Sequence, residues 1–195
     1  MRRLFVAACA VMLICSAGTF AATWNIDPAH SNATFKVRHL GISNVSGSFK
    51  KMTGAIQMDE ADITKSTVEA VIDATSLDTG EPKRDEHLKS PDFFDVATNP
   101  TITFKSKKVE KAGEGKLKVT GDLTMRGVTK EVVLDVSGPL TPVAAFGGMR
   151  SGATATTTIN RQDFGVAWSK VMEGGGLVVG NDVAITIELE LAQKK

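Results

Sequence analysis

Apolar and polar residues alternate with a period of two along most of this chain, which is the pattern of strands with one buried face. In residues 32–39, for example, Ala33, Phe35, Val37 and His39 share one parity. The same alternation recurs in five further segments, residues 67–74, 101–105, 116–123, 131–136 and 183–191. A weaker, threonine-rich segment covers residues 151–159, and no amphipathic helical stripe of useful length interrupts the series. The pattern predicts an all-β protein.

Residues 45–58 keep the alternation only if its phase changes midway. Val45 and Phe49 fall on one parity, whereas Ile56 and Met58 fall on the other. A β-bulge within residues 50–54 would bring all of these side chains to the inner face. With this segment the sequence predicts eight antiparallel strands. Strands with one apolar face must close into a barrel or stack as two sheets, and their length favours a barrel.

An eight-stranded barrel is just wide enough to be filled by its own side chains or to hold one ligand. A filled barrel would be a structural protein that binds another protein. A hollow one would be a binding protein for an apolar molecule. The alternation itself is compatible with both.

The connection from residue 76 to residue 100 breaks the rhythm of the strands. Connections of about 25 residues are uncommon in a compact domain unless they form a lid or binding loop, or are disordered. Phe93 and Phe94 argue against a solvated loop, because it would leave two large apolar rings in water. We expect one short helical turn within residues 84–90 and a lid over one end of the barrel.

The first residues have the parts of a secretory signal peptide. A basic pair precedes an apolar run at residues 4–14, and the small residues that follow favour cleavage after Ala21. The apolar run is too short to span a bilayer. We therefore expect a signal peptide at residues 1–21, one domain at residues 22–195 and no stable membrane insertion. Both cysteines lie in the expected signal peptide, so we expect no thiol chemistry in the mature domain.

Charge and motifs limit the chemistry further. Lys and Arg number 23 against 22 Asp and Glu, which argues against nucleic-acid binding by phosphate neutralisation. His30, His39 and His87 lack the close spacing of metal ligands, so we expect no metal and no cofactor. No nucleophile motif occurs either, and we expect no enzyme activity. The alternative is an enzyme that acts on a bound prenyl lipid, with His39 or His87 as general base.

Three arginines, Arg84, Arg126 and Arg161, lie in predicted connections. A fixed guanidinium group at a cavity mouth would suit an anionic head group. The alternative is a structural role in which Arg84 and Arg161 pair with nearby aspartates and fasten loops. The sequence favours the structural role.

Several blocks of sequence, taken together and in order, resemble the YceI-like family. They include residues 26–31 (IDPAHS), 84–88 (RDEHL), 92–95 (DFFD), 121–130 (GDLTMRGVTK) and 160–165 (NRQDFG). The resemblance covers essentially the whole expected mature chain. It implies a lipocalin-like, extended eight-stranded antiparallel barrel, exported to the bacterial periplasm. It also implies binding of a long isoprenoid or similar amphiphilic lipid, as a carrier or sequestering protein.

The predicted ligand site combines inward apolar side chains with a few polar ones. Its apolar lining is expected to comprise Phe35, Val37, Phe49, Ile72, Phe94, Phe104, Leu123, Leu134 and Ile187. Burial of an isoprenoid tail is worth about 0.8 kcal/mol per methylene-sized group, so tight binding needs no charged anchor. His39, with Arg84 or His87, is the candidate for the head group. A two-fold homodimer is a further expectation.

Overall fold

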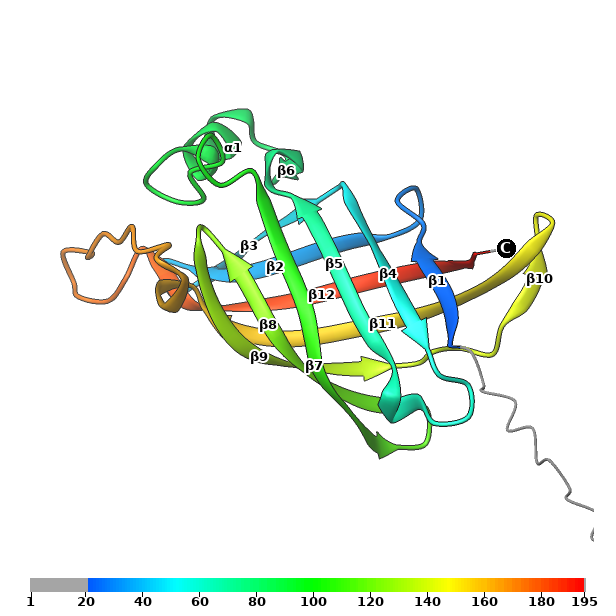
Figure 1. Cartoon of the computed structure of the whole chain (residues 1–195). Coiled ribbons are helices and arrows are strands. Elements are labelled where there is room, and N and C mark those ends of the chain that lie inside the picture. Colours follow the sequence, from blue (N-terminus) through cyan, green and yellow to red (C-terminus); the bar gives the residue numbers. More distant parts are fainter. Residues whose placement is uncertain (1–20, 195) are drawn as a thin grey trace, which may run out of the picture.

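The computed structural model describes residues 21–194, which form antiparallel strands and one short α-helix (Figure 1). The strands are β1 (Ala22–Ile26), β2 (Asn32–His39), β3 (Ser43–Phe49), β4 (Met52–Met58), β5 (Thr67–Asp73), β6 (Leu77–Asp78), β7 (Thr101–Gly113), β8 (Lys116–Met125), β9 (Val128–Ser137), β10 (Val143–Ala145), β11 (Gly148–Asn160) and β12 (Val179–Gln193). The helix is α1 (Pro82–Lys89). The predicted signal peptide lies outside the described residues, apart from Ala21. No helix within residues 21–194 has the length and apolar character needed to cross a membrane.

Eight strands close a ring through the pairings β1–β4–β5–β7–β8–β9–β11–β12–β1. The last strand, β12, pairs with β11 along one edge and with β1 and β2 along the other. β2 and β3 extend the wall beyond β1 and β4, and β6 adds a short pairing to β3. The predicted eight-stranded antiparallel barrel is therefore confirmed.

The phase change expected in residues 45–58 is an interruption between β3 and β4. Phe49 ends β3 and Met52 begins β4, and both side chains are buried although their parities differ. Lys50 and Lys51, between them, bond through their backbones to other elements: the Lys50 N–H donates to the Ser76 carbonyl and the Lys51 carbonyl accepts from Asp73. The two strands thus form one bent wall element whose apolar side chains all face inward.

Two packed clusters occupy the two ends of the barrel. At the end that holds both described termini, six side chains form a floor: Trp24, Ile26, Met52, Ile56, Met58 and Leu191. At the other end the lid contributes Phe93, which packs with residues such as Phe49, Leu77 and Phe164. Inward side chains between these clusters, among them Phe35, Ile72 and Ile185, are only partly buried. Apolar side chains that face inward yet keep accessible surface indicate a hollow middle.

The long connection forms the expected lid. Its helix begins at Pro82, two residues before the predicted turn, because proline is well suited to the first turn of a helix. The Glu81 side chain caps it by accepting from the Lys83 N–H. Phe94, beyond the helix, meets Phe49 edge to face with ring centroids 5.5 Å apart. In Figure 1 the helix lies above the strand ends at one end of the barrel.

Two glycines make room for the aromatic rings of the interior. A Cβ at Gly121 would lie 2.5 Å from both the Lys105 carbonyl oxygen and the Phe104 ring. A Cβ at Gly47 would lie 2.4 Å from the Phe35 ring. Any side chain at these positions would displace the rings. The glycines therefore set where Phe35 and Phe104 lie.

We predict that Gly121→Ala destabilises the fold by about 1–3 kcal/mol, because the added methyl group overlaps a backbone carbonyl that cannot move away. The free energy of unfolding in urea measures the effect. Gly148→Ala is the matched control, since a Cβ there meets nothing within 4 Å. Equal stability of the two variants would contradict the prediction.

Candidate ligand-binding cavity

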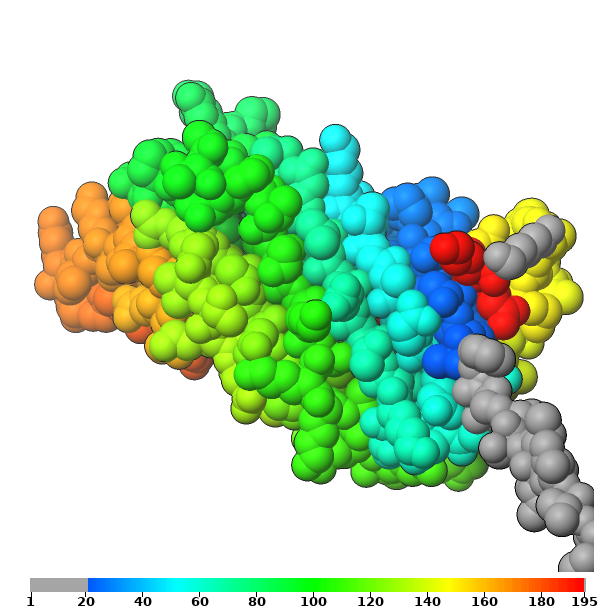
Figure 2. Space-filling model, in the orientation of Figure 1, coloured from blue at the N-terminus to red at the C-terminus, as the bar shows by residue number. Residues whose placement is uncertain are grey.

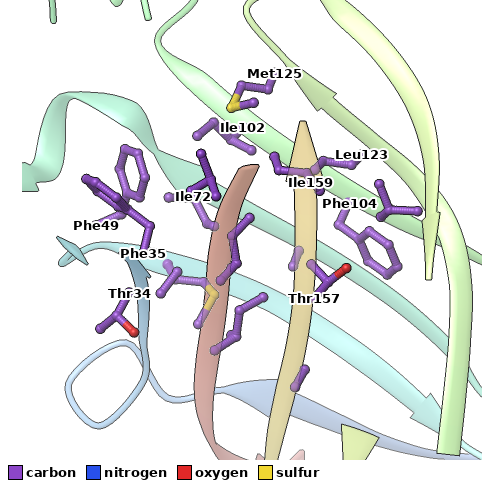
Figure 3. A pocket seen from close by; sticks show the side chains of 18 of the residues that line it. Thr34, Phe35, Phe49, Ile72, Ile102, Phe104, Leu123, Met125, Thr157 and Ile159 are labelled. Atoms are coloured by element: carbon purple, nitrogen blue, oxygen red, sulfur yellow. The ribbon is translucent and has the colours of Figure 1, made fainter. Parts of the chain in front are cut away.

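A cavity of about 180 Å³ occupies the barrel between the floor and the lid. One water molecule needs roughly 10–15 Å³ by the same kind of measure, so the interior is hollow. Its lining is apolar apart from a few threonines and Arg161. Figure 3 shows phenylalanine, isoleucine and leucine side chains from opposite walls converging on this space. The side chains of the barrel therefore do not fill its interior.

The cavity brings together all nine apolar residues predicted for it: Phe35, Val37, Phe49, Ile72, Phe94, Phe104, Leu123, Leu134 and Ile187. Eight of them come from seven strands, and Phe94 comes from the lid connection. Their contact with a ligand remains a prediction. Their shared position follows from the alternation, because in a barrel every second residue of each strand faces the interior.

The three polar candidates for the head group are not among the residues that line the cavity, and their contact with a head group stays a prediction. Arg84 donates to the Thr79 hydroxyl at 2.8 Å and to the Thr79 carbonyl at 3.0 Å, so it fastens the start of the lid. The His87 Nε2 lies 3.0 Å from an Asp92 carboxylate oxygen, and both residues are exposed. His39 has the inward parity, but it ends β2 beyond Val37, the last residue of that strand in the lining.

The two histidines named in the catalytic alternative lie outside the cavity lining. A general base must come within hydrogen-bond reach of the proton that it takes from the bound molecule. Neither His39 nor His87 is among the residues that face the cavity. His87 instead packs edge to face against Phe93 and Trp168, with ring centroids 5.0 Å and 5.4 Å away.

Sequence reasoning missed the contribution of β11. Ala155, Thr157 and Ile159 line the cavity from this strand, and the Thr157 side chain is visible in Figure 3. The available signal was the small size of the residues in this threonine-rich segment. Small inward side chains leave space in a barrel, so the segment that looked like a weak strand is the part of the wall that keeps the interior open.

Arg161 is the buried cation beside the cavity, with 4% of its surface exposed. All five of its N–H groups donate to protein oxygens, namely the carbonyls of Gly180 (2.9 Å), Val166 (2.6 Å), Trp168 (2.8 Å) and Val179 (3.3 Å) and the Asn181 side chain (3.3 Å). Burial lowers the pKa of its guanidinium group, because desolvation disfavours the charged form. The expected loop-fastening role is correct, but its partners are mostly carbonyls rather than aspartates.

Arg126 fastens the same end of the barrel from the turn between β8 and β9. Its guanidinium donates to the Pro91 carbonyl of the lid connection at 2.6 Å and to the Gly165 carbonyl. The ring of Phe93 in the lid connection also packs against the ring of Trp168 in the segment between Gly165 and β12, and their centroids lie 5.3 Å apart. The lid end is thus held by two arginines and an aromatic stack.

We predict that Arg161→Met lowers the free energy of unfolding by at least about 3 kcal/mol, because it leaves several buried carbonyls without donors. Chemical denaturation followed by tryptophan fluorescence measures the loss. Arg38→Met, on the exposed face of β2, is the control and is expected to change stability by less than about 0.5 kcal/mol. A similarly small change at Arg161 would show that its hydrogen bonds contribute little.

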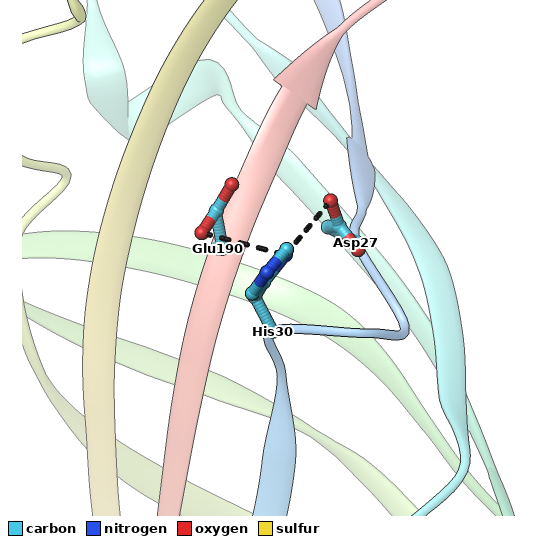
Figure 4. A group of neighbouring side chains, drawn as sticks. All are labelled: Asp27, His30 and Glu190. Atoms are coloured by element: carbon cyan, nitrogen blue, oxygen red, sulfur yellow. Dashed lines mark ion pairs between the residues drawn. The ribbon is translucent and has the colours of Figure 1, made fainter. Parts of the chain in front are cut away.

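A second polar cluster lies at the floor end and was not predicted. His30 Nδ1 lies 3.3 Å from an Asp27 carboxylate oxygen and 3.7 Å from one of Glu190 (Figure 4). The Arg150 guanidinium approaches Asp27 at 3.9 Å and Glu190 at 4.0 Å. One ligand atom from each of Asp27, His30 and Glu190 fits within 4.8 Å, as in a metal site. Because Arg150 already neutralises the same carboxylates, we interpret the group as an ion-pair cluster that fastens the β1–β2 bend to β12.

We predict that Asp27→Asn destabilises the protein at neutral pH and that the difference narrows as the pH falls below 3.8. The backbone N–H of Ala29, with smaller effects of His30 and Arg150, lowers the pKa of the Asp27 carboxyl from 3.8. A lowered folded-state pKa stabilises the fold above the unfolded value, and this stability is lost as the carboxyl is protonated. Urea denaturation across this pH range measures the difference. Glu60→Gln, at an exposed position, is the control, and a difference that stays constant with pH would contradict the assignment.

The fold and the site together define a class: an antiparallel eight-stranded barrel with a lidded, apolar internal cavity. The model of the YceI-like domain family matches residues 24–191, and the chain belongs to this family. It is 40% identical over 167 residues to a UPF0312 protein of Vibrio parahaemolyticus, covering 85% of this chain and 88% of that protein. It is 38% identical over 148 residues to a UPF0312 protein of Ectopseudomonas mendocina, covering 75% and 78%.

Solved structures share the architecture. Burkholderia cenocepacia BcnA superimposes with a TM-score of 0.71 at 25% identity, covering 85% of this chain and 98% of that one. The Campylobacter jejuni YceI protein gives 0.68 at 33% identity, covering 81% and 90%. A polyisoprenoid binding domain from Saccharophagus degradans gives 0.65 at 18% identity, covering 90% and 99%, and this likeness concerns the fold alone.

Proposed function

We propose that this protein binds a long isoprenoid or similar amphiphilic lipid in its barrel and acts as a carrier or sequestering protein. The observation that carries the proposal is the lined but unfilled interior. Large apolar side chains face one another across a space that they do not fill. An empty apolar cavity forfeits dispersion contacts along its lining, and a flexible hydrocarbon would restore them. The polyisoprenoid binding domain of the related fold supports the same class of ligand.

The lining indicates how such a ligand would be selected. Arg161 directs every N–H group at protein oxygens, so it has no donor left for a head group. The remaining polar lining comes from threonines, such as Thr103 and Thr157. Binding would therefore depend on the length and shape of the apolar tail between floor and lid, with a weak preference for the head group.

We also propose a location and an assembly. The N-terminal pattern supports export to the periplasm, where a lipid in transit between membranes needs an apolar container. One barrel with one ligand is the proposed binding unit, and a two-fold dimer remains a prediction. We propose no catalytic step.

The test is to fill the cavity from one wall. Thr157→Trp places an indole in the lined space, whereas Thr158→Trp places the same group on the exposed face of β11 one residue away. We expect Thr157→Trp to reduce binding of a fluorescent prenyl alcohol at least about tenfold, because the ring occupies volume that the tail needs. Thr158→Trp is expected to bind like the wild type, and thermal unfolding shows whether both variants fold.

Wild-type protein that takes up no prenyl alcohol, or that binds it equally well after Thr157→Trp, would contradict the proposal. A complementary measurement is mass spectrometry of an organic extract from protein purified out of its producing cells. The expected result is a stoichiometric amphiphile.

A further inference from the structure

The two ends of the cavity are closed in different ways. At the floor, Ile26 of β1 and Met52 of β4 line the cavity, with 5% and 2% of their surface exposed. Trp24 and Leu191 of the same cluster are buried and do not line the cavity, so they back the floor. In Figure 2 the blue, cyan and red segments at this end leave no hollow between them on the visible face. The floor is therefore a solid end wall built from strand side chains.

The floor offers no polar side-chain atom to the cavity. The only nitrogen or oxygen in the side chains of the floor cluster is Trp24 Nε1. It has no hydrogen-bond partner among the described residues, but it has almost no accessible surface, so it is closed to the cavity. None of the four residues of the ion-pair cluster at this end lines the cavity either.

The nearest polar lining residue on β2, Thr34, is exposed on the outer face and already donates its hydroxyl to the Thr186 carbonyl at 3.2 Å. A hydroxyl or phosphate group buried at the floor would therefore lose its water without gaining hydrogen bonds, which is unfavourable. The floor suits the hydrocarbon end of a ligand.

The lid end, by contrast, offers polar side chains and water. Its cover consists of the lid connection and the segment between β11 and β12, and His87 and Asp92 of the lid are exposed. Thr157 and Arg161 line the cavity two residues before and two residues after Ile159, which belongs to the packed cluster at the lid end. A head group at this end can keep its water while the tail is buried.

Ile26 and Met52 differ in how firmly they are placed. A Cβ at Gly54 would lie 2.9 Å from Ile26 Cδ1, so the glycine leaves the room in which this side chain lies. Met52 pairs with Ile72 of β5, and its unbranched side chain is flexible. Truncation of Met52 would extend the cavity toward the rest of the floor cluster, whereas added atoms beside it would shorten the cavity.

We propose that the lipid lies with the end of its tail on Ile26 and Met52 and with its head group at the lid end, so that these two floor residues set the longest tail that the barrel accepts. This inference rests on the proposed function. It goes further by giving the orientation of the ligand and the residues that select its length.

The experiment is a competition among prenyl alcohols that differ by one isoprene unit, from farnesol to solanesol. The protein is loaded from an equimolar mixture in ethanol, and mass spectrometry of the extract gives the distribution of bound lengths. Met52→Ala is expected to shift this distribution by about one isoprene unit toward longer chains, because the truncation leaves space at the end of the tail. Met125→Ala is the matched control. Met125 also lines the cavity and is 6% exposed, but it belongs to the cluster at the lid end, so its truncation is expected to leave the distribution unchanged.

A substitution of opposite sign tests the same floor without removing any part of it. Ala70 lines the cavity and packs against the floor cluster. Ala70→Val is expected to shift the distribution toward shorter chains, because the added methyl groups occupy space beside Met52. Ala184→Val makes the same change on the exposed face of β12 and is expected to bind like the wild type. Ala70→Val also carries the test if Met52→Ala does not fold.

The two tryptophans of the chain report the orientation. Trp24 lies in the floor, and Trp168 packs against the rings of His87 and Phe93 at the lid end. A prenyl alcohol that carries a nitroxide on its oxygen is expected to quench the fluorescence of Trp168, measured in Trp24→Phe, more strongly than that of Trp24, measured in Trp168→Phe. Stronger quenching of Trp24 would place the head group at the floor and would overturn the proposal.

The outcomes separate this inference from the proposed function. A wild-type protein that takes up no prenyl alcohol of any length would refute the proposed function. Loading with a length distribution that neither Met52→Ala nor Ala70→Val changes would refute only the assignment of the floor. A shift in Met125→Ala alone would refute it as well, because the lid end would then stop the tail.

Discussion

The pairing of β11 with β12 is the constraint on which the rest of the structure depends. It runs through eleven consecutive residue pairs, from Arg150 opposite Ala192 to Asn160 opposite Asp182. In the strand order, β11 lies near one end of the sheet and β12 lies well inside it. The pairing of these two strands therefore closes the sheet into a ring. An open sheet of the same strands would turn its apolar face to water. The cavity, its floor and its lid exist only because this edge is closed.

The pairings that close the ring differ in length. β11 pairs with β9 through only three residue pairs among the described residues, around Ala155 and Val136. Toward the lid end, beyond these three pairs, Val132 and Leu134 of β9 and Ile159 of β11 line the cavity. Space inside is preserved in a related way. Small residues lie opposite or against large ones: Ala33 pairs with Phe49, Ala70 with Phe104 and Ala155 with Ile187, and Gly47 and Gly121 lie against the rings of Phe35 and Phe104.

A period of two identifies the face of a residue but not its height along the barrel axis. The sequence therefore predicted the barrel and its apolar lining, but it could not show that His39 lies opposite the lining residue Val179 without lining the cavity itself. The alternation also could not predict which side chains that lie far apart in the sequence would form ion pairs. His30 lies beside the carboxylates of both Asp27 and Glu190. The residues next to Asp27 in the sequence give no sign that Glu190 will lie nearby. The charge of Arg161 suggested aspartate partners, whereas its partners are mostly backbone carbonyls. Every residue has a backbone carbonyl, so the sequence does not show which ones accept these hydrogen bonds.

Three of the sequence blocks that mark the family supply polar side chains that fasten connections in this structure. Residues 26–31 supply Asp27 and His30 to the cluster at the floor, residues 121–130 supply Arg126 and residues 160–165 supply Arg161. Each fastens a connection to the barrel, so the blocks specify a closed container with a fixed lid. The blocks also supply part of the apolar lining, such as Phe94 and Leu123, and the alternation of the strands outside the blocks provides most of the rest. In this chain the distance from floor to lid and the size of the inward side chains together determine the shape of the cavity.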